Sequence, residues 1–424
     1  MSKNHGLFIA ALIAVVLWFA QPWIAPAWSA TSWHALVIAL FVMALWVGQF
    51  LPLPVTGLLA VTLIVVAGVL PAKAAFAAFA QPTLFFIIGA LALAVGVEES
   101  GLGRTIACKV FHAAKPTVGG VRRATLWGSA ALALVIPEHA VAAVVIPMAT
   151  QIIPKGSKHP SIILAAALGA VIGGIVTFLG GARNILAVSI LEEFQGTGIA
   201  HGTWILDALP VAALILLLAD LLLTRLEPGS TPLTLPEHCP TTAQGKRMAW
   251  VMAAAIAAWA FWGETVGLAP IALAATVAMV VFKAAKWEAV SKHLPWGVVL
   301  MFGGALAMGG ALAQSGAAAN IAAYTPDSVG LAAAMSMILT QGISNAAAVA
   351  TLLPILLPGS SDPIATTLAI ALGGGLAFAL PMGAPAIAIA WATGQVTMGQ
   401  LVRIGVTLGI ASWFILMGAA AWWW

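Results

Sequence analysis

Charged side chains are scarce in this chain. Only 7% of its 424 residues are Asp, Glu, Lys or Arg, whereas 62% are hydrophobic. A soluble globular domain has roughly a quarter charged and about half apolar residues, so this composition excludes a soluble fold. The two cysteines, Cys108 and Cys239, are far apart and form no metal or redox spacing, so we assign them no function.

Motifs for nucleotide, metal and nucleic-acid chemistry are also missing. No Gly-x-Gly-x-x-Gly or Walker-type loop opens a helix, which disfavours an ATP-driven pump. The eight histidines show no His-Glu-x-x-His spacing. The basic residues form short clusters rather than a stripe, so we expect no nucleic-acid partner. We therefore expect no cofactor other than a coupling ion.

The chain instead contains long runs with almost no charge. Six of them are residues 7–20, 34–50, 56–70, 84–97, 204–224 and 401–424. Their lengths suit membrane spans and half-spans, and a backbone in lipid must satisfy its own hydrogen bonds as helix. The first run resembles a cleaved signal peptide, but we expect it to be retained because the later spans need it to set their orientation.

The placement of the charges predicts the topology. Of the 17 Lys and Arg residues, all except Lys73 and Arg183 fall in alternate loops, which the positive-inside rule makes cytoplasmic. About 11 crossings fit this pattern. The sequence predicts an inner-membrane, multi-pass protein with its N-terminus in the cytoplasm and its C-terminus outside. Asp220 is interpreted as an interfacial residue with Arg225 within about one helical turn of reach.

Three pairs of segments recur in the same order in both halves of the chain. In the predicted topology the two members of each pair run in opposite directions, which is typical of the inverted repeats of transporters. The pairs are Gly89–Ala92 with Gly304–Ala307, Pro137–Ala140 with Ser344–Ala347, and Gly180–Asn184 with Gly383–Ile387.

The second and third pairs predict unusual helices. The second pair lies in apolar stretches that are too long for one span and whose flanking charges lie on one side, so each stretch is expected to be a re-entrant hairpin. The third pair breaks helices in mid-membrane, where open backbone must line a cavity or be packed in protein. Such breaks present helix N-termini to anions and carbonyls to cations.

These features divide the chain into four parts. We expect N-terminal scaffold helices (1–80), a first inverted repeat (81–226), a cytoplasmic loop with further scaffold helices (227–293) and a second inverted repeat (294–424). The first repeat is predicted to contain a hairpin at 122–153 and a broken helix at 161–194. The second is predicted to contain a hairpin at 328–358 and a broken helix at 363–394.

From about Gln81 to the C-terminus the chain resembles the divalent anion/sodium symporters, which carry dicarboxylates, citrate and sulfate, as a divergent member of the ion transporter superfamily. The family pairs Ser-Asn-Thr hairpin tips with Thr-Pro-Pro-Asn-like breaks. Ser344–Ala348 is similar to the second tip, Thr177–Asn184 to the first break and Leu380–Gly394 to the second break. The resemblance implies a homodimer and an elevator-type exchange of the hairpin domain against a fixed scaffold.

The chain departs from the family pattern mainly in its first half. Pro137-Glu138-His139 stands where the family has Ser-Asn-Thr, and Arg183 stands where it has Pro. A fixed Arg183 cation would replace a bound sodium ion electrostatically, and Glu138 could pair with it. In the second half Ala346, Ala384 and Ile387 remove side-chain oxygens. Sodium coupling is therefore in question, and the rivals are a proton relay through Glu138 and His139 or a purely structural network.

We expect a substrate cavity bounded by the two tips and the two breaks. The candidate substrate-binding residues are Glu138, His139, Ala140, Gly181, Arg183, Asn184, Ser344, Asn345, Ala346, Gly383, Ala384 and Pro385. The candidate ion-coupling residues are Glu138, His139, Asn184 and Asn345. Sodium, if it binds, would use backbone oxygens near Gly180, Asn345 and Gly383.

The sequence therefore predicts an all-α elevator-type secondary transporter of a small anion, C4-dicarboxylate-like or sulfate-like. We expect it to be proton-coupled or an exchanger rather than strictly sodium-coupled. A cation/proton antiporter or arsenite-type metalloid exporter with Glu138 as ion carrier is the alternative within transport. An intramembrane enzyme using Glu138 and His139 as acid and base is a remote alternative, because it lacks a nucleophile or metal set.

Overall fold

The computed structural model describes residues 3–236 and 239–424, and within these ranges the regular secondary structure is helical, with no strand and one isolated bridge between Thr117 and Pro232. The N-terminal helices are α1 (Lys3–Phe19), α2 (Gln21–Ile24), α3 (Ala30–Gly48), α4 (Leu53–Val66), α5 (Ala72–Ala77) and η1 (Ala78–Ala80). Helices α13 (Ala243–Val266), α14 (Leu268–Val281) and α15 (Trp287–His293) lie between the two halves of the chain.

The element order of the first half returns in the second half. The first series is α6 (Pro82–Glu99), α7 (Leu102–His112), α8 (Val118–Leu132), α9 (Glu138–Ile152), α10 (Pro160–Gly173), α11 (Ala182–Gln195) and α12 (His201–Leu226). The second series is α16 (Trp296–Gln314), α17 (Ala317–Ala322), α18 (Val329–Leu339), α19 (Asn345–Leu356), η2 (Leu357–Gly359), α20 (Pro363–Gly375), α21 (Pro385–Ala392) and α22 (Met398–Trp422). Apart from η2, the two series match helix for helix.

A local detail supports the repeat. Gly101 and Gly316 follow the matched helices α6 and α16 and directly precede α7 and α17, and their φ angles are 75° and 78°. Only glycine adopts this left-handed conformation without steric cost. The serine before each glycine makes the same bonds in both halves, since Ser100 Oγ donates to Val97 O and Ser315 Oγ donates to Leu312 O. The two segments are therefore similar in backbone conformation as well as in amino-acid sequence.

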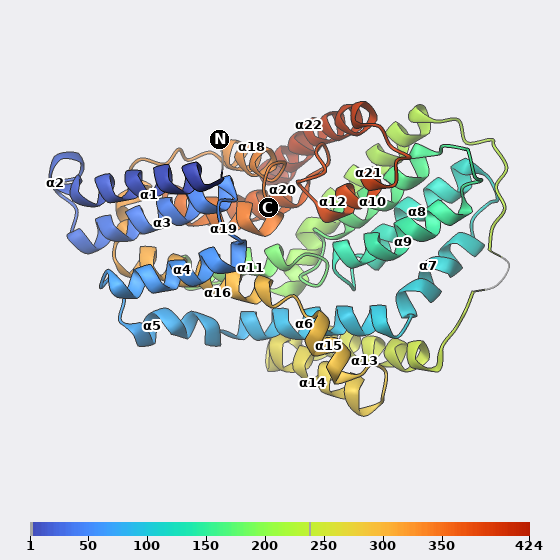
Figure 1. Ribbon diagram of the computed structural model, residues 1–424, viewed down its shortest axis with the longest axis horizontal. Helices are drawn as coiled ribbons and strands as arrows, with labels where there is room; N and C mark the ends of the chain where they lie inside the picture. The colour runs from blue at the N-terminus through green and yellow to red at the C-terminus, as the bar shows by residue number, and fades with distance from the viewer. Residues whose placement is uncertain (1–2, 237–238) are drawn as a thin grey trace.

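Two pairs of short helices approach the centre of the molecule from opposite ends. In Figure 1 the pair α8 and α9 lies to the right of centre, and α19, the second helix of the other pair, lies to the left. Each pair is followed by a broken helix, with irregular backbone at residues 174–181 between α10 and α11 and at 376–384 between α20 and α21. The first break is buried throughout, whereas the second is buried except at Leu380 to Met382, where Met382 is exposed.

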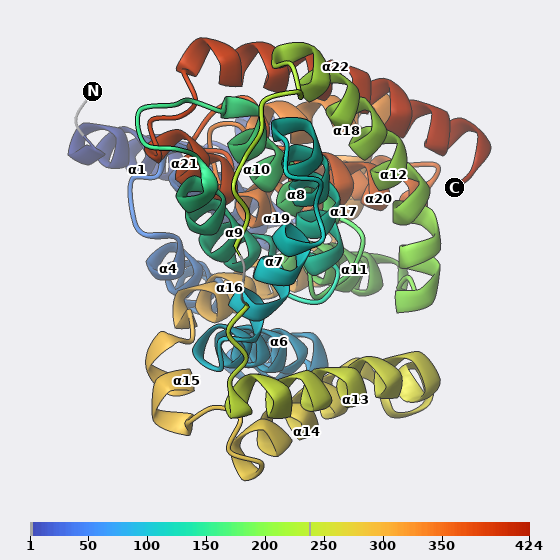
Figure 2. The same ribbon diagram turned by 90° about the vertical axis from the view of Figure 1, so that its right-hand side faces the viewer.

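The helices between the two halves lie at one side of the molecule. In Figure 2 α13, α14 and α15 lie at the bottom with α6 above them, while α22 lies at the top and α12 runs from the top down the right-hand side. Helix α4 packs closely on α16, because a Cβ at Gly57 would lie only 2.6 Å from Leu300 O. This close approach of two backbones needs glycine.

Six helical segments in the described part of the chain are long and apolar enough to cross a membrane. They are Ala30–Gly48, Ala72–Glu99, His201–Leu226, Ala243–Val266, Trp296–Gln314 and Met398–Trp422. Shorter apolar helices, including α4, α9, α10, α14 and α18 to α20, accompany them. The all-helical polytopic fold is confirmed, while the number of crossings and their orientation stay predictions.

Two expectations about single residues were wrong or incomplete. Asp220 Oδ2 accepts a hydrogen bond of 2.9 Å from Arg123 Nε, and not from Arg225, because α8 packs beside α12. Cys108 and Cys239 form a disulfide that ties α7 to the segment before α13. A sequence separation of 131 residues gave no sign of this bond.

Candidate functional site

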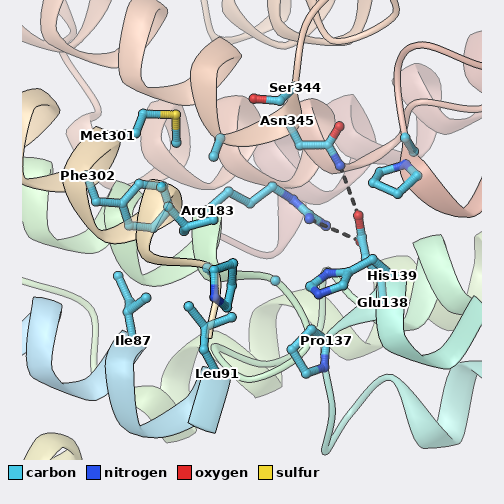
Figure 3. A pocket seen from close by; sticks show the side chains of 18 of the residues that line it. Ile87, Leu91, Pro137, Glu138, His139, Arg183, Met301, Phe302, Ser344 and Asn345 are labelled. Atoms are coloured by element: carbon cyan, nitrogen blue, oxygen red, sulfur yellow. Dashed lines mark hydrogen bonds and ion pairs between the residues drawn. The ribbon is translucent and has the colours of Figure 1, made fainter. Parts of the chain in front are cut away.

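A cavity of about 600 Å³ lies where the two hairpin tips and the two helix breaks meet. The tips contribute Pro137 to His139 and Ser344 to Ala346, and the breaks contribute Phe178 to Arg183 and Pro381 to Pro385. The opposite wall is apolar and comes from α4, α6 and α16, with Ile87, Leu91, Met301 and Phe302 visible in Figure 3. This volume suits a small molecule.

Four helices begin at the cavity. Helix α9 begins at Glu138, α11 at Ala182, α19 at Asn345 and α21 at Pro385, and all four residues line the cavity. The first N–H groups of a helix have no intrahelical partner, and the helix dipole places partial positive charge there. Four N-termini around one cavity make it electropositive even before side chains are counted.

A buried ion pair lies at the centre of the site. Arg183 Nη1 donates to Glu138 Oε2 at 3.1 Å, and the two side chains are only 3% and 7% exposed. The other carboxylate oxygen, Oε1, accepts from Asn345 Nδ2 at 3.1 Å. Figure 3 shows the Glu138 carboxylate held between the Arg183 guanidinium and the Asn345 amide. The tip of one repeat thus contacts both the break that follows it and the tip of the other repeat.

Arg183 has spare hydrogen-bond capacity. Its Nε and Nη2 are buried and have no partner among the described residues. Glycines make the space for the pair: a Cβ at Gly375 would collide with Nη2 of Arg183, and a Cβ at Gly174 would collide with Oε2 of Glu138. Buried guanidinium N–H groups are costly to leave unpaired, so Arg183 keeps the capacity to donate to a further acceptor.

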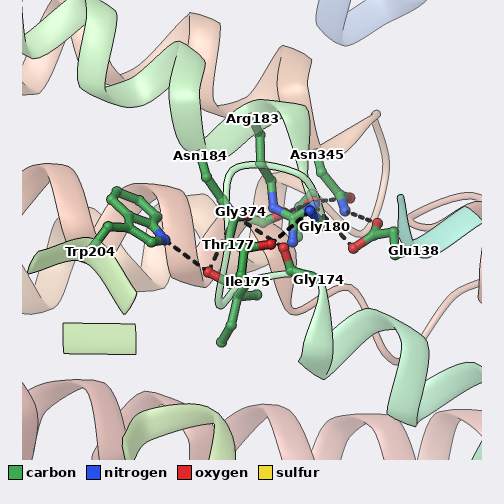
Figure 4. Close-up of polar contacts among 11 residues, drawn as sticks. Glu138, Gly174, Ile175, Thr177, Gly180, Arg183, Asn184, Trp204, Asn345 and Gly374 are labelled. Atoms are coloured by element: carbon green, nitrogen blue, oxygen red, sulfur yellow. Dashed lines mark hydrogen bonds and ion pairs between the residues drawn. The ribbon is translucent and has the colours of Figure 1, made fainter. Parts of the chain in front are cut away.

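Asn184 holds the first break together. Its Nδ2 lies 3.0 Å from Gly174 O, 3.2 Å from Ile175 O and 2.7 Å from Thr177 O (Figure 4). Trp204 Nε1 also donates to Ile175 O, at 3.1 Å. The carbonyls that converge at this break are therefore served by donors of the protein itself.

The second break is held differently. Gln341 Nε2 donates to Met337 O at 3.0 Å, and its Oε1 accepts from Ala379 N at 3.0 Å. Nearby, Thr340 Oγ1 lies 2.8 Å from Asn345 Oδ1 and 2.7 Å from Gly374 O. A hydroxyl has one proton, so it serves one of these two oxygens at a time.

Most of the predicted site residues line this cavity. They are Glu138, His139, Gly180, Gly181, Arg183, Ser344, Asn345, Ala346, Gly383, Ala384 and Pro385. The His139 imidazole is exposed in the cavity wall. Asn184 and Ala140 are outside the lining, because Asn184 is fully buried in the break and Ala140 is half-buried in α9.

The sequence analysis missed the apolar wall and the polar contacts behind the site. Ile87 and Leu91 are one helical turn apart on α6, where Leu91 lies within the first segment of the repeat and Ile87 just before it. That position was the only available signal. Thr340 and Gln341 gave none. No group of three or more His, Cys, Asp or Glu residues in the described part of the chain could hold a metal ion.

A multi-pass helical protein whose two repeats meet at a central electropositive cavity is a secondary transporter. Comparison with known proteins agrees and adds the family. The citrate transporter family model matches residues 5–161 and 38–373, so the chain belongs to that family. The expected resemblance to carriers of citrate and dicarboxylates is thereby confirmed, and the chain is a transporter and not an enzyme.

The individual relatives are distant. An uncharacterized transporter of Haemophilus influenzae is 25% identical, with 89% of each chain covered. A sodium-dependent dicarboxylate transporter, SdcS of Staphylococcus saprophyticus, is 23% identical over 88% of this chain and 82% of its own length. The crystal structure of the YdaH transporter of Alcanivorax borkumensis matches with a TM-score of 0.58 and 17% identity, covering 82% of this chain and 87% of that one. The last likeness concerns the fold alone.

Proposed function

We infer that this transporter carries a small dianion, C4-dicarboxylate-like or sulfate-like, and that protons or a counter-anion drive it rather than sodium alone. The observation that carries this proposal is the buried Glu138–Arg183 pair at a cavity where four helices begin. Arg183 and the helix N-termini supply the positive field for an anion. Ser344 and Asn345 supply neutral hydrogen-bonding groups at its rim.

Glu138 acts in this proposal as an internal anion that competes with the substrate. Its carboxylate already occupies one edge of the Arg183 guanidinium. An incoming dianion that takes this edge leaves Glu138 without its cation in a buried place. A lone buried carboxylate is strongly disfavoured in its charged form, so Glu138 takes up a proton when it is displaced. Anion binding and proton uptake are then coupled through one side chain.

The first break argues against a sodium ion on this side of the cavity. The three carbonyls of Gly174, Ile175 and Thr177 converge on the Asn184 amide, and the Arg183 cation lies beside them. A second cation at this point would find these carbonyls already served by a donor, with Asn184 Oδ1 as an unpartnered oxygen beside them, and it would repel the guanidinium. SdcS is named as a sodium-dependent dicarboxylate transporter. Our proposal therefore takes the substrate class, a dicarboxylate, from this relative but does not take sodium as the coupling ion.

We also propose the arrangement in the membrane and the assembly. The N-terminus is cytoplasmic and the C-terminus is outside in an inner membrane, as the charge distribution predicts. The functional unit is a homodimer in which the hairpin domain moves against the α3, α4, α6, α13, α14 and α16 scaffold in an elevator-type exchange. Cross-linking in the membrane and labelling of single introduced cysteines from each side test these two points.

The function itself is tested by uptake of labelled succinate and sulfate into proteoliposomes. One set of vesicles has only a sodium gradient, a second has only a pH gradient, and a third is loaded with unlabelled anion. We expect accumulation with the pH gradient or by exchange. Accumulation of either anion with a sodium gradient alone would contradict the proposed proton coupling. The absence of uptake under every gradient would contradict the proposed anion transport.

Glu138→Gln separates the coupling role from a structural one. The amide keeps hydrogen-bonding capacity but cannot change charge, so exchange should persist while accumulation driven by a pH gradient should fall at least tenfold. Asp220→Asn is the matched control, because Asp220 also pairs with an arginine but lies outside the cavity. If the Glu138 variant kept the pH-driven accumulation of the control, Glu138 would be a structural residue only.

A further inference from the structure

A second hollow lies on the opposite side of the scaffold, away from the substrate cavity. It is a groove of about 660 Å³ between α13 and α14. Alanines at helical spacing form its floor, with Ala254 and Ala258 on α13 and Ala274 and Ala278 on α14. Figure 2 shows these two helices as the lowest layer of the molecule, with no helix below them. Only 22% of the apolar window of α13 is buried, the smallest share among the six membrane-span candidates.

One end of the groove is aromatic and basic. Trp250 and Phe282 line it and are 78% and 60% exposed, and Arg247 lines it beside them. Helices α13 and α14 run antiparallel around Gly267, so the beginning of α13 and the end of α14 lie at the same end of the pair. That end carries four exposed cations, Lys246, Arg247, Lys283 and Lys286.

These cations are not neutralised within the described part of the chain. None of the four is in an ion pair there. The acids on neighbouring elements are three against these four cations: Glu98 and Glu99 end α6, where Glu99 is paired with His293 at 3.5 Å, and Glu288 lies in the first turn of α15. The groove therefore ends in a local excess of positive charge.

The dimensions of the groove fit one leaflet of a bilayer. From Arg247 to Ala258 a helix rises roughly 17 Å, which is close to half of the about 30 Å hydrocarbon thickness. An acyl chain can lie on the alanines while a phosphate lies at the cations and at the interfacial Trp250. Charge complementarity thus specifies an anionic head group.

We propose that the α13–α14 groove binds one phospholipid with an anionic head group, its phosphate on Arg247 and Lys283 and an acyl chain along the alanines. A second copy of the chain is the rival occupant, but a twofold interface would place this basic end against its own equivalent or leave it unpaired. The site is independent of the proposed anion transport, since no residue of this groove lines the substrate cavity.

Native mass spectrometry of the detergent-purified full chain tests the proposal. The protein is incubated with equal amounts of phosphatidylglycerol and phosphatidylcholine that have identical acyl chains. We expect one phosphatidylglycerol per chain, retained at least tenfold over phosphatidylcholine. Arg247→Gln/Lys283→Gln should abolish this preference, while the matched variant Lys155→Gln/Lys158→Gln, which removes two exposed cations elsewhere, should keep it.

A second variant tests the groove without changing charge. Ala254→Leu/Ala278→Leu fills it and should reduce bound phosphatidylglycerol at least fivefold with the oligomeric state unchanged. Equal retention of the two lipids by the unmodified chain would overturn the proposal, as would a loss in the Lys155/Lys158 control as large as in the Arg247/Lys283 variant. A dimer that dissociates in the leucine variant while lipid preference persists would assign the groove to a second copy.

Discussion

The two hairpin tips use the same backbone for different chemistry. Glu138 and Asn345 are the first residues of α9 and α19, and they meet through a hydrogen bond of 3.1 Å. The first tip has Pro137 as N-cap and no capping side chain, so a carboxylate and Arg183 dominate it. The second has Ser344, whose Oγ accepts from Ala347 N, and it carries no charge. The fold fixes where the tips meet, while single side chains decide which ion they can handle.

The same contrast appears where the broken helices begin. Helix α20 carries its own cap, since Asp362 Oδ1 accepts from Ala365 N at 3.0 Å. Helix α10 begins after His159 and has no local cap. Its carboxylate comes from the end of α12: Glu227 Oε2 accepts from Ser161 N at 3.2 Å and from Ser161 Oγ at 2.6 Å, and Oε1 lies 2.6 Å from His159 Nδ1. The first repeat is thus held by contacts distant in sequence where the second uses local ones.

Of all the changes considered, the removal of Arg183 should have the largest effect on stability and transport, because it removes the cation that sets the first tip apart from the second. Arg183→Ala leaves Glu138 buried without its cation, which destabilises a protein by about 3–5 kcal/mol, and it removes the proposed anion ligand. We expect anion transport to fall more than 100-fold and the melting temperature to drop. The double variant Arg183→Ala/Glu138→Ala should regain melting temperature but not transport. Recovery of transport in the double variant would show that Arg183 only neutralises Glu138.

The two breaks should respond unequally to the loss of their amides. Asn184→Ala leaves the carbonyls of Gly174 and Thr177 without a donor at a fully buried break, while Ile175 O keeps Trp204, and we expect about 2–4 kcal/mol of destabilisation, as for other lost buried networks. Gln341→Ala removes the corresponding support of the second break, where Gln341 is only half-buried, and should cost less. Thermal unfolding of the two purified variants checks the order. Equal shifts would mean that the breaks are held alike.

The space around the ion pair can be tested without touching a charge. Gly375→Ala places a methyl group against Nη2 of Arg183, so the guanidinium must move. We expect at least a tenfold fall in anion uptake with a small change in folding. Gly309→Ala is the matched control in another buried apolar helix, because its Cβ would lie 3.8 Å from Phe194 Cε2 in ordinary contact. Similar uptake by both variants would show that the exact position of Arg183 is unimportant.

The smallest expected effects concern the caps. Asp362→Ala removes a local N-cap and should cost about 1 kcal/mol. Glu227→Ala removes the remote cap of α10 and leaves three polar atoms of His159 and Ser161 without an acceptor, so we expect about 1–3 kcal/mol. Thermal shift measurements on the two variants give the comparison directly. A larger shift for Asp362→Ala would reverse our view that the first repeat depends on distant contacts.

The sequence predicted the place of the site better than its contacts. Gly180-Gly181 and the Pro381 to Pro385 segment interrupt apolar runs, and such interruptions survive in a membrane only where they line a cavity or are packed. Their order in the chain therefore located the cavity. The rarity of charges at that depth made a pairing of Glu138 with Arg183 one of two possibilities, beside an Arg183 that faces the cavity alone, and the structure has the pair.

Contacts between distant neutral residues could not be predicted in this way. Asn345 and Glu138 are 207 residues apart, and the role of Asn184 depends on how the backbone of the break folds back on it. The pattern of residue types along the chain does not show which distant residues come into contact. Asp220 shows the same limit, because sequence proximity favoured Arg225 while helix packing placed Arg123 beside it.

The bond between Glu138 and Asn345 makes the two halves unexchangeable. A chain assembled from two first halves would set one glutamate against another at the centre, and like charges repel at that distance. A chain assembled from two second halves would set amide against amide and would lack an arginine to attract an anion. If the halves descend from one duplicated ancestor, the duplicates had to diverge at this point before the bond between Glu138 and Asn345 could form. A reversal of only one of the two residues would now remove this bond.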